Sequence, residues 1–384
     1  MNIVNKISKN NYFFLSILFF LFFQFHLKVT LLNILKMKAI FRFLFLLIGL
    51  QVLQAQDNLQ AINQHFAQSS SVVWSLTLPH TKEPFPIHWQ ERQGTFNSKG
   101  YRSFVGYHGE TFVGTLTLSE QTLFGEILYA GKSYVLTVSD AGILQLTQEQ
   151  KTRCGTATIQ SKNTSKASHG VGFRNTFPES DEDKNDPPIT PPTPYNLLYP
   201  KSLIHTDGVW RLYRLALPVD YSYYIMKKPF NGDKAKIKAF WYATETFLNE
   251  LYGNDIGVHF ELIDDDRLII TSQEKALFPK KVSGNEVVNN GTIVFNKYYN
   301  PKDYDLAVVL TDFRERYNGL AAVYSAYQQH QKASAAARPV GPSTIAHEIG
   351  HMFGADHTFS NGGVYSEKTE TDRGQSIMSY GHEY

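Results

Sequence analysis

Five residues near the carboxyl end of the chain have the types and spacing of a three-histidine metal site. His347 and His351 are four residues apart, which on a helix places both imidazoles on one face, one turn apart. Glu348 would lie about 100° around the helix from His347, within reach of a water molecule in the site. Gly354 can take the left-handed conformation that ends a helix, so that the chain turns back and His357 supplies a third nitrogen. Three protein ligands with a fourth position open are typical of catalytic zinc, and Glu348 is the expected general base.

The same helix has an apolar side that predicts its packing. Ile345, Ile349 and Met352 fall away from the histidine pair and are expected in a core. Helix histidines without a metal are the alternative, and the coincidence of three ligands, a base and a turn glycine argues against it.

This run resembles the extended zinc motif of the metzincin metalloproteases, and a second segment resembles another element of that clan. Met378, in the sequence Ser-Ile-Met-Ser-Tyr downstream of His357, is similar to the Met-turn that places a methionine beneath the zinc. An ordinary core methionine is the alternative. His357-Thr358-Phe359 and Ile-Met-Ser-Tyr are most similar to the bacterial reprolysin-like, adamalysin-related enzymes. Eukaryotic adamalysins usually have an aspartate where Thr358 stands. The resemblance covers about residues 206–384.

The resemblance implies an α/β (α+β) metzincin-type catalytic domain with a mixed sheet, an active-site helix and a Met-turn. It also implies one catalytic zinc ion and protein or peptide substrates. Tyr380 matches a tyrosine that stabilises the oxyanion in the astacin and serralysin branches, with a packing aromatic as the alternative. Gly319, Leu320 and Ala321 resemble the edge strand that runs antiparallel to bound substrate. A surface strand or turn with small residues is the alternative reading of these three.

The elements upstream of the motif fit the same architecture. A helix is expected from a cap at Asp233 to about Tyr252, with Gly253 as its stop. Residues 258–262 alternate between apolar and polar, and residues 306–310 form a continuous apolar run. Both are predicted to be strands, the second buried on two faces.

The composition changes along the chain and predicts two domains. Residues 56–160 contain alternating segments, such as 111–118 and 134–138, separated by Gly, Asn and Asp turns, and are expected to form a β-rich pro-domain. Residues 161–205 are acidic and Pro-rich, cannot bury enough apolar surface to fold, and are expected to be an exposed linker. Residues 206–384 are then the catalytic domain.

The pro-domain contains the single cysteine of the chain, which cannot form an intrachain disulfide. Arg153-Cys154-Gly155 resembles the cysteine switch of metzincin propeptides, in which a thiolate fills the open zinc position. Arg153 would favour the thiolate, the form that binds metal. The switch implies a zymogen, whereas a buried, inert Cys154 is the alternative.

The amino terminus predicts export. Residues 37–55 have a basic start, a short apolar run and a small residue before a cleavage point after Ala55, which is the pattern of a secretory signal peptide. Residues 1–36 are expected to be an upstream extension from a misassigned start, with a signal anchor as the alternative. No apolar stretch after residue 55 is long enough to span a membrane, so we expect a secreted protein, extracellular, periplasmic or at the cell surface.

Composition excludes little else. A net charge of +2 gives no reason to expect a nucleic-acid partner. Asp264-Asp265-Asp266 is expected to be a solvated strand-end turn rather than a calcium site, and calcium dependence and oligomeric state stay open. The chain ends shortly after Met378, where metzincins normally continue, so the catalytic domain is expected to be truncated, with a truncated gene and a fragment of a longer chain as the two explanations.

The expected reaction is hydrolysis of peptide bonds, with Glu348 accepting the proton of the attacking water and passing it to the leaving amine. Two other functions would also use such a site. One is an exported zinc-site protein that binds or adheres without cleaving, and the other is a zinc amidase or esterase. Glu348 argues against the first, and an extended groove along residues 319–323 would argue against the second.

Overall fold

The computed structural model describes residues 58–79, 83–130, 132–149, 155–157, 210–226, 230–315, 317–338, 341–355, 357 and 377–378. The predictions about the signal peptide, the linker, Cys154 and Tyr380 lie outside these residues. Within the described part of the chain, no helix combines the length and the apolar character needed to cross a membrane.

The first module is an antiparallel sheet in which each strand pairs with the next along the sequence. Its strands are β1 Ser71–Leu76, β2 Phe85–Arg92, β3 Arg102–His108, β4 Thr111–Leu118, β5 Leu123–Tyr129, β6 Lys132–Val138 and β7 Leu144–Glu149. A 3-10 turn, Thr95–Lys99, connects β2 to β3. Helix α2, Leu59–Ala67, begins at Asn58, whose side chain accepts a hydrogen bond from the Ala61 amide at 2.8 Å. Phe66 of α2 packs among the strand residues Trp89 and Phe104, which closes a core on one face of the sheet. The predicted β-rich character of this region is therefore observed.

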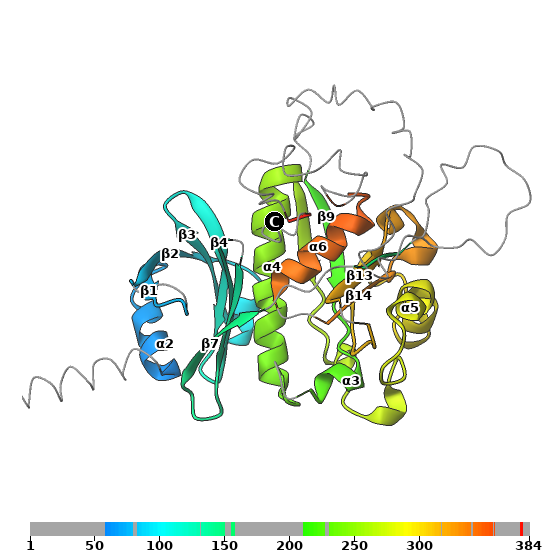
Figure 1. The fold of residues 1–384 in the computed structure, drawn as a ribbon, viewed down its shortest axis with the longest axis horizontal. Coiled ribbons are helices and arrows are strands. Elements are labelled where there is room, and N and C mark those ends of the chain that lie inside the picture. The colour runs from blue at the N-terminus through cyan, green and yellow to red at the C-terminus, as the bar shows by residue number, and fades with distance from the viewer. Residues whose placement is uncertain are drawn as a thin grey trace, which may run out of the picture.

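The opposite face of this sheet packs on the longest helix, α4, Lys234–Ile256 (Figure 1). Asp233 begins the helix as predicted, because its carboxylate accepts hydrogen bonds from the amides of Ala235 and Lys236. The predicted end at Gly253 is wrong. Gly253 keeps the helical conformation, and the left-handed residue that ends the helix is Gly257, with φ +65°.

The second module contains two short sheets and confirms the predicted mixed α/β character. In the first, β9, Arg211–Ala216, pairs in parallel with β10, Val258–Leu262, and with β11, Leu306–Ala307. In the second, β14, Ala335–Ala337, lies between the parallel β12, Val309–Leu310, and the antiparallel β13, Gly319–Ala322. The fourth strand, β8, Gly155–Ala157, is far away in sequence and pairs in parallel with β13.

The predicted single strand at residues 306–310 is in fact two short strands in different sheets. Val308 lies between them, and its amide donates to the Ala216 carbonyl at 3.1 Å. All of these residues are fully buried, as predicted, because helices cover both faces.

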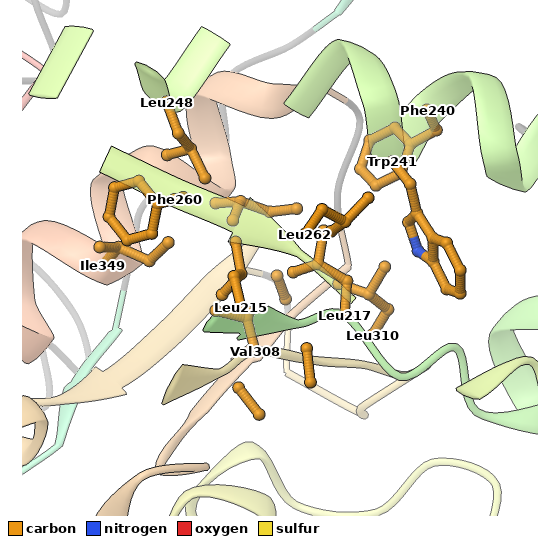
Figure 2. Close-up of a cluster of buried hydrophobic side chains, with 14 of the residues drawn as sticks. Leu215, Leu217, Phe240, Trp241, Leu248, Phe260, Leu262, Val308, Leu310 and Ile349 are labelled. Atoms are coloured by element: carbon orange, nitrogen blue, oxygen red, sulfur yellow. The ribbon is translucent and has the colours of Figure 1, made fainter. Parts of the chain in front are cut away.

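Three further α-helices surround these sheets: α3, Tyr221–Tyr224; α5, Gly284–Tyr298; and α6, Pro342–Met352. Four short 3-10 turns lie at Asp266–Leu268, Gln273–Lys275, Ser325–Tyr327 and Gln329–Gln331. Figure 2 shows the core between them. Phe240, Trp241 and Leu248 of α4 and Ile349 of α6 converge with strand residues and their neighbours, which are Leu215, Leu217, Phe260, Leu262, Val308 and Leu310.

The acidic run after β10 is less solvated than predicted. Lys238 forms ion pairs with Asp264 and, at 2.8 Å, with Asp266. The hydroxyl of Tyr242 donates to Asp264 at 2.7 Å, and Asp265 pairs with Arg267. The three carboxylates therefore form ion pairs and hydrogen bonds with Lys238 and Tyr242 of α4 and with Arg267. We interpret the run as a structural network of charges.

Candidate active site

Helix α6 presents the predicted histidines and ends where the sequence predicts. Its Ile345, Ile349 and Met352 are fully buried, as expected for the apolar side. Gly354 follows the helix with φ +97°, and its amide donates to the His351 carbonyl at 2.8 Å. This left-handed residue reverses the chain and brings the next turn back toward the helix.

The reversal brings His357 against the helix pair. The Nε2 atom of His347 lies 3.0 Å from that of His357 and 3.2 Å from that of His351, and the third Nε2–Nε2 separation is 3.1 Å. All three side chains are buried, and in the described part of the chain they form the one cluster of His, Cys, Asp or Glu able to hold a metal ion.

Backbone carbonyls orient two of the rings. Nδ1 of His347 lies 2.7 Å from the carbonyl oxygen of Ile377, and Nδ1 of His351 lies 2.7 Å from that of Ala355. A carbonyl oxygen can only accept, so each Nδ1 must donate its proton. The neutral ring then has a lone pair on Nε2, which points at the centre of the cluster.

Burial also favours the neutral rings. Desolvation, followed by the proximity of His347 and His357, lowers the pKa of His351 well below its usual range. Desolvation and the neighbouring His347 lower the pKa of His357 to about 3. At neutral pH these imidazoles are uncharged, which is the form that binds a metal.

The donor set fits zinc. With zinc–nitrogen distances of about 2.0–2.1 Å, tetrahedral ligands lie about 3.3–3.4 Å apart, close to the separations of 3.0–3.2 Å between the three Nε2 atoms. Three imidazole nitrogens, two of them on rings whose Nδ1 protons are oriented by carbonyls, are a usual zinc-binding set. Three protein ligands leave a fourth position for water or substrate.

Glu348 lies beside the ligand cluster and against the second sheet. Its side chain is fully buried. A Cβ atom placed on Gly319 would lie 2.1 Å from the Glu348 Oε1 atom, so the carboxylate occupies the space that a side chain on β13 would need. The predicted general base and the predicted substrate strand are therefore in direct contact.

Strand β13 is not the edge of its sheet in this structure, contrary to the prediction. Gly319, Leu320 and Ala321 pair with β14 on one side, and residues 320–322 pair with Gly155–Ala157 on the other. The sequence favoured an open edge because local patterns carry no information about a strand contributed from more than 150 residues upstream.

Met378 lies behind the active-site helix. It is 8% exposed, and a Cβ on Gly350 would lie 2.4 Å from its sulfur. The small Gly350 in the last turn of α6 therefore lets the methionine side chain approach the helix closely. Tyr252 of α4 fixes the same helix, since its hydroxyl donates to the Ala346 carbonyl at 2.6 Å.

One residue near the site was not anticipated from the sequence. Glu126 of β5 is buried and accepts hydrogen bonds from the amide and the hydroxyl of Ser343, at the start of α6. An acidic residue inside a strand of apolar neighbours, Phe124 to Ile127, was the available signal. The local pattern could not predict its partner Ser343, which is 217 positions away in the sequence.

One of three comparisons with known proteins agrees with this geometry. Residues 239–358 match the model of the reprolysin-like metallopeptidases of family M12B. No curated protein matches the sequence significantly. Among solved structures, the crystal structure of metalloproteinase-II from Bacteroides fragilis aligns over 80% of this chain and 88% of that chain, with 12% identity and a TM-score of 0.44, too low to establish a shared fold.

The matched residues run from α4 to one residue past the third histidine, so they contain the ligand set, the buried glutamate and β13. This segment is similar to the reprolysin-like metallopeptidases of family M12B, and the match together with the three-histidine cluster supports a zinc metalloendopeptidase.

Proposed function

We propose that the chain is exported as a latent zinc endopeptidase in which Glu348 is the proton carrier and Cys154 holds the site inactive. One observation carries the catalytic part of the proposal. The buried Glu348 carboxylate lies next to the three-histidine cluster and touches Gly319 of the strand on which an extended peptide would bind. A site that only bound metal would have no need for this carboxylate.

His347, His351 and His357 would hold the zinc ion through their Nε2 atoms. When bound, zinc supplies Lewis-acid chemistry, polarising the scissile carbonyl and making an attacking water more acidic. The Glu348 carboxylate accepts a proton from that water as the water attacks the carbonyl carbon. The same carboxyl group then delivers the proton to the leaving nitrogen, so that the amine departs in a neutral form.

Strand β13 orients the substrate in this proposal. Its residues Gly319, Leu320 and Ala321 are small or apolar and offer backbone groups to a pairing strand. A peptide that pairs there is held extended beside Glu348, so the peptide bond meets the base in a fixed geometry. The proposed substrate class is therefore an extended or unfolded segment of a protein.

Latency is proposed because part of the chain already occupies that strand position. Gly155–Ala157 pairs with β13 in parallel, at the side where a substrate strand would pair. Cys154 directly precedes Gly155 in the sequence. A thiolate there would compete with water for the open ligand position. Export through residues 37–55 is proposed from the signal-peptide pattern alone.

The catalytic proposal predicts that Glu348→Gln retains zinc and loses peptidase activity. The amide has nearly the same shape but cannot accept the proton of the attacking water. The expected loss in kcat is at least on the order of 10²-fold. Zinc content by mass spectrometry and cleavage of unfolded casein would be measured on the same samples. Glu286→Gln, an exposed glutamate of α5, is the matched control. Turnover of Glu348→Gln at the wild-type rate would refute the assigned role.

The latency proposal predicts that Cys154→Ala makes the uncleaved chain at least partly active. Removing the thiolate opens the fourth ligand position, although Gly155–Ala157 still lies on β13. The comparison is between intact Cys154→Ala and intact wild type on one fluorogenic peptide, with Cys154→Ser as a variant of similar size. Equal inactivity of both intact chains would show that Cys154 is not the switch.

A further inference from the structure

Helix α6 begins without a cap from its own segment. Its N-cap residue is Gly341, which has no side chain to accept hydrogen bonds from the first amides. Glu126 of β5 provides this acceptor instead: its Oε2 accepts from the Ser343 amide at 2.7 Å, and its Oε1 accepts from the Ser343 hydroxyl at 2.6 Å. The catalytic helix is thus capped by a carboxylate of the other module.

The carboxylate fits this position closely. Glu126 is 1% exposed, and Oε1 also accepts from the hydroxyl of Ser133 on β6 at 2.6 Å. A Cβ on Gly341 would lie 2.4 Å from the Glu126 carboxyl carbon, so the glycine is what admits the carboxylate. Three donors and the positive end of the helix dipole all favour a buried anion here.

The cap belongs to a continuous interface between the modules. Phe96, Phe124 and Val135 belong to the first module, which contains α2 and β1–β7 and is called the β-module below. They are part of the same hydrophobic cluster as residues of α4 in the second, catalytic module. Phe124 packs edge-on against Phe240, with ring centroids 5.0 Å apart. Because α4 is buried along most of its length, loss of the β-module would expose apolar residues of the catalytic core.

Polar contacts also join the two modules. The Thr115 hydroxyl donates to the Ala243 carbonyl at 3.2 Å, and the Thr246 hydroxyl donates to Ser103 at 2.7 Å. Arg92 forms an ion pair with Glu250 at 2.8 Å. These contacts lie on β2 to β4, away from the strand that occupies β13.

We propose that strands β1–β7 are a permanent part of the active peptidase, and that Glu126 is a positioning residue for the active-site helix. This inference rests on the proposed latency and deepens it. After cleavage of the linker, β8 leaves β13 and opens the substrate position, whereas the seven-stranded sheet stays docked on α4. His347 and His351 lie one and two turns beyond Ser343, so the Glu126 cap fixes the helix that presents them.

The first test asks whether the cut chain stays together. A specific protease site is inserted in the linker of the full Glu348→Gln chain, which cannot digest itself, and the cut protein is analysed by size-exclusion chromatography. Both fragments should elute together in native buffer and separate only in denaturant. Separation in native buffer would overturn the inference.

The same cut in wild-type protein distinguishes this inference from the latency proposal. Fragments that stay together but gain no activity would refute latency and leave the permanent module standing. Fragments that separate and gain full activity would support latency and refute the permanent module.

The second test addresses Glu126 itself. In the full chain, Glu126→Gln keeps the shape of the side chain and removes its charge. We expect faster hydrogen exchange at the Ser343 amide and zinc binding weakened about fivefold, measured by competition with a chromogenic chelator. Ser343→Ala should give a similar loss in zinc affinity, and the double variant should lose little more than either single one, because both break one interaction.

Glu120→Gln, an exposed glutamate in the turn before β5, is the matched control and should not change zinc affinity. If Glu126→Gln keeps the wild-type zinc affinity and the wild-type rate of hydrogen exchange at the Ser343 amide, the positioning role is refuted. Simple additivity of Glu126→Gln and Ser343→Ala would do so as well.

Discussion

The imidazole rings of His347 and His351 each donate through Nδ1 to a backbone carbonyl, which leaves both Nε2 atoms ready to bind metal. These two ligands and Glu348 were predictable because helical periodicity alone sets their relation. His357 was predictable because Gly354 allows the turn, and the observed φ of +97° is in the region that favours glycine. The acceptor for His347 was not predictable, since Ile377 reaches it only through the tertiary fold.

The contact between Gly319 and Glu348 gives a prediction at this scale. In Gly319→Ala the new methyl group would overlap the Glu348 carboxylate, which must move away from its present position. We expect kcat to fall by about 10- to 100-fold with bound zinc unchanged, because a misplaced base loses its reactive geometry. Kinetics and metal content are measured on the same preparation.

Gly253→Ala in α4 is the control for that substitution. The nearest atom to the new Cβ would be 3.4 Å away, an ordinary contact, and alanine favours a helix. If Gly319→Ala has the wild-type kcat, the carboxylate does not act from the place in which the structure shows it.

At the scale of elements, α4 is connected to the neighbouring sheet by a buried acid. Glu245 of α4 accepts a hydrogen bond from the Leu262 amide of β10 at 3.0 Å. Burial raises the pKa of Glu245 to about 7, with smaller contributions from Glu261 and Asp264 that also raise it. The unfolded chain has the ordinary glutamate pKa of about 4.5. At pH values between about 4.5 and 7, Glu245 therefore holds its proton more often in the folded state than in the unfolded state.

The sign of the pH effect follows directly. The contribution of Glu245 to stability is fully present below about pH 4.5 and is lost as the pH rises through about 7. Relative to Glu245→Gln, which cannot ionise, the wild type should lose stability on the order of 3 kcal/mol between about pH 5 and pH 8. Urea unfolding of both proteins at several pH values measures this difference. A constant difference across that range would contradict the burial of an ionisable Glu245.

The sequence predicted those features of the helices and strands that depend only on neighbouring residues. The cap at Asp233 and the alternation in Val258–Leu262 depend on neighbouring residues only, and both appear in the structure. The end of α4 was misplaced because Gly253 can remain helical, whereas the left-handed turn at Gly257 depends on how the chain enters β10. The division of residues 306–310 between two sheets depends on which strands are present on each side.

At the scale of the whole molecule, α4 is shared by two modules. One side of the helix carries the seven-stranded sheet, and the other carries the sheets and helix of the zinc site (Figure 1). The sequence indicated two domains from a change in composition. It could not indicate that Glu126 caps the catalytic helix or that Gly155–Ala157 lies on β13, because both contacts join segments that are distant along the chain. In our proposal, the pairing of Gly155–Ala157 with β13 blocks the substrate position, and the Glu126 cap positions the helix that carries the metal ligands.

The most direct test of the account is a zinc titration of linker-cleaved protein stripped of metal with a chelator. Hydrolysis of unfolded casein should be absent at first, rise with added zinc and reach a plateau at one equivalent per chain. His351→Ala should remain inactive throughout the titration, because two imidazoles do not make the three-ligand site. Full hydrolysis by the metal-free protein, or wild-type activity of His351→Ala, would contradict a single catalytic zinc ion held by His347, His351 and His357.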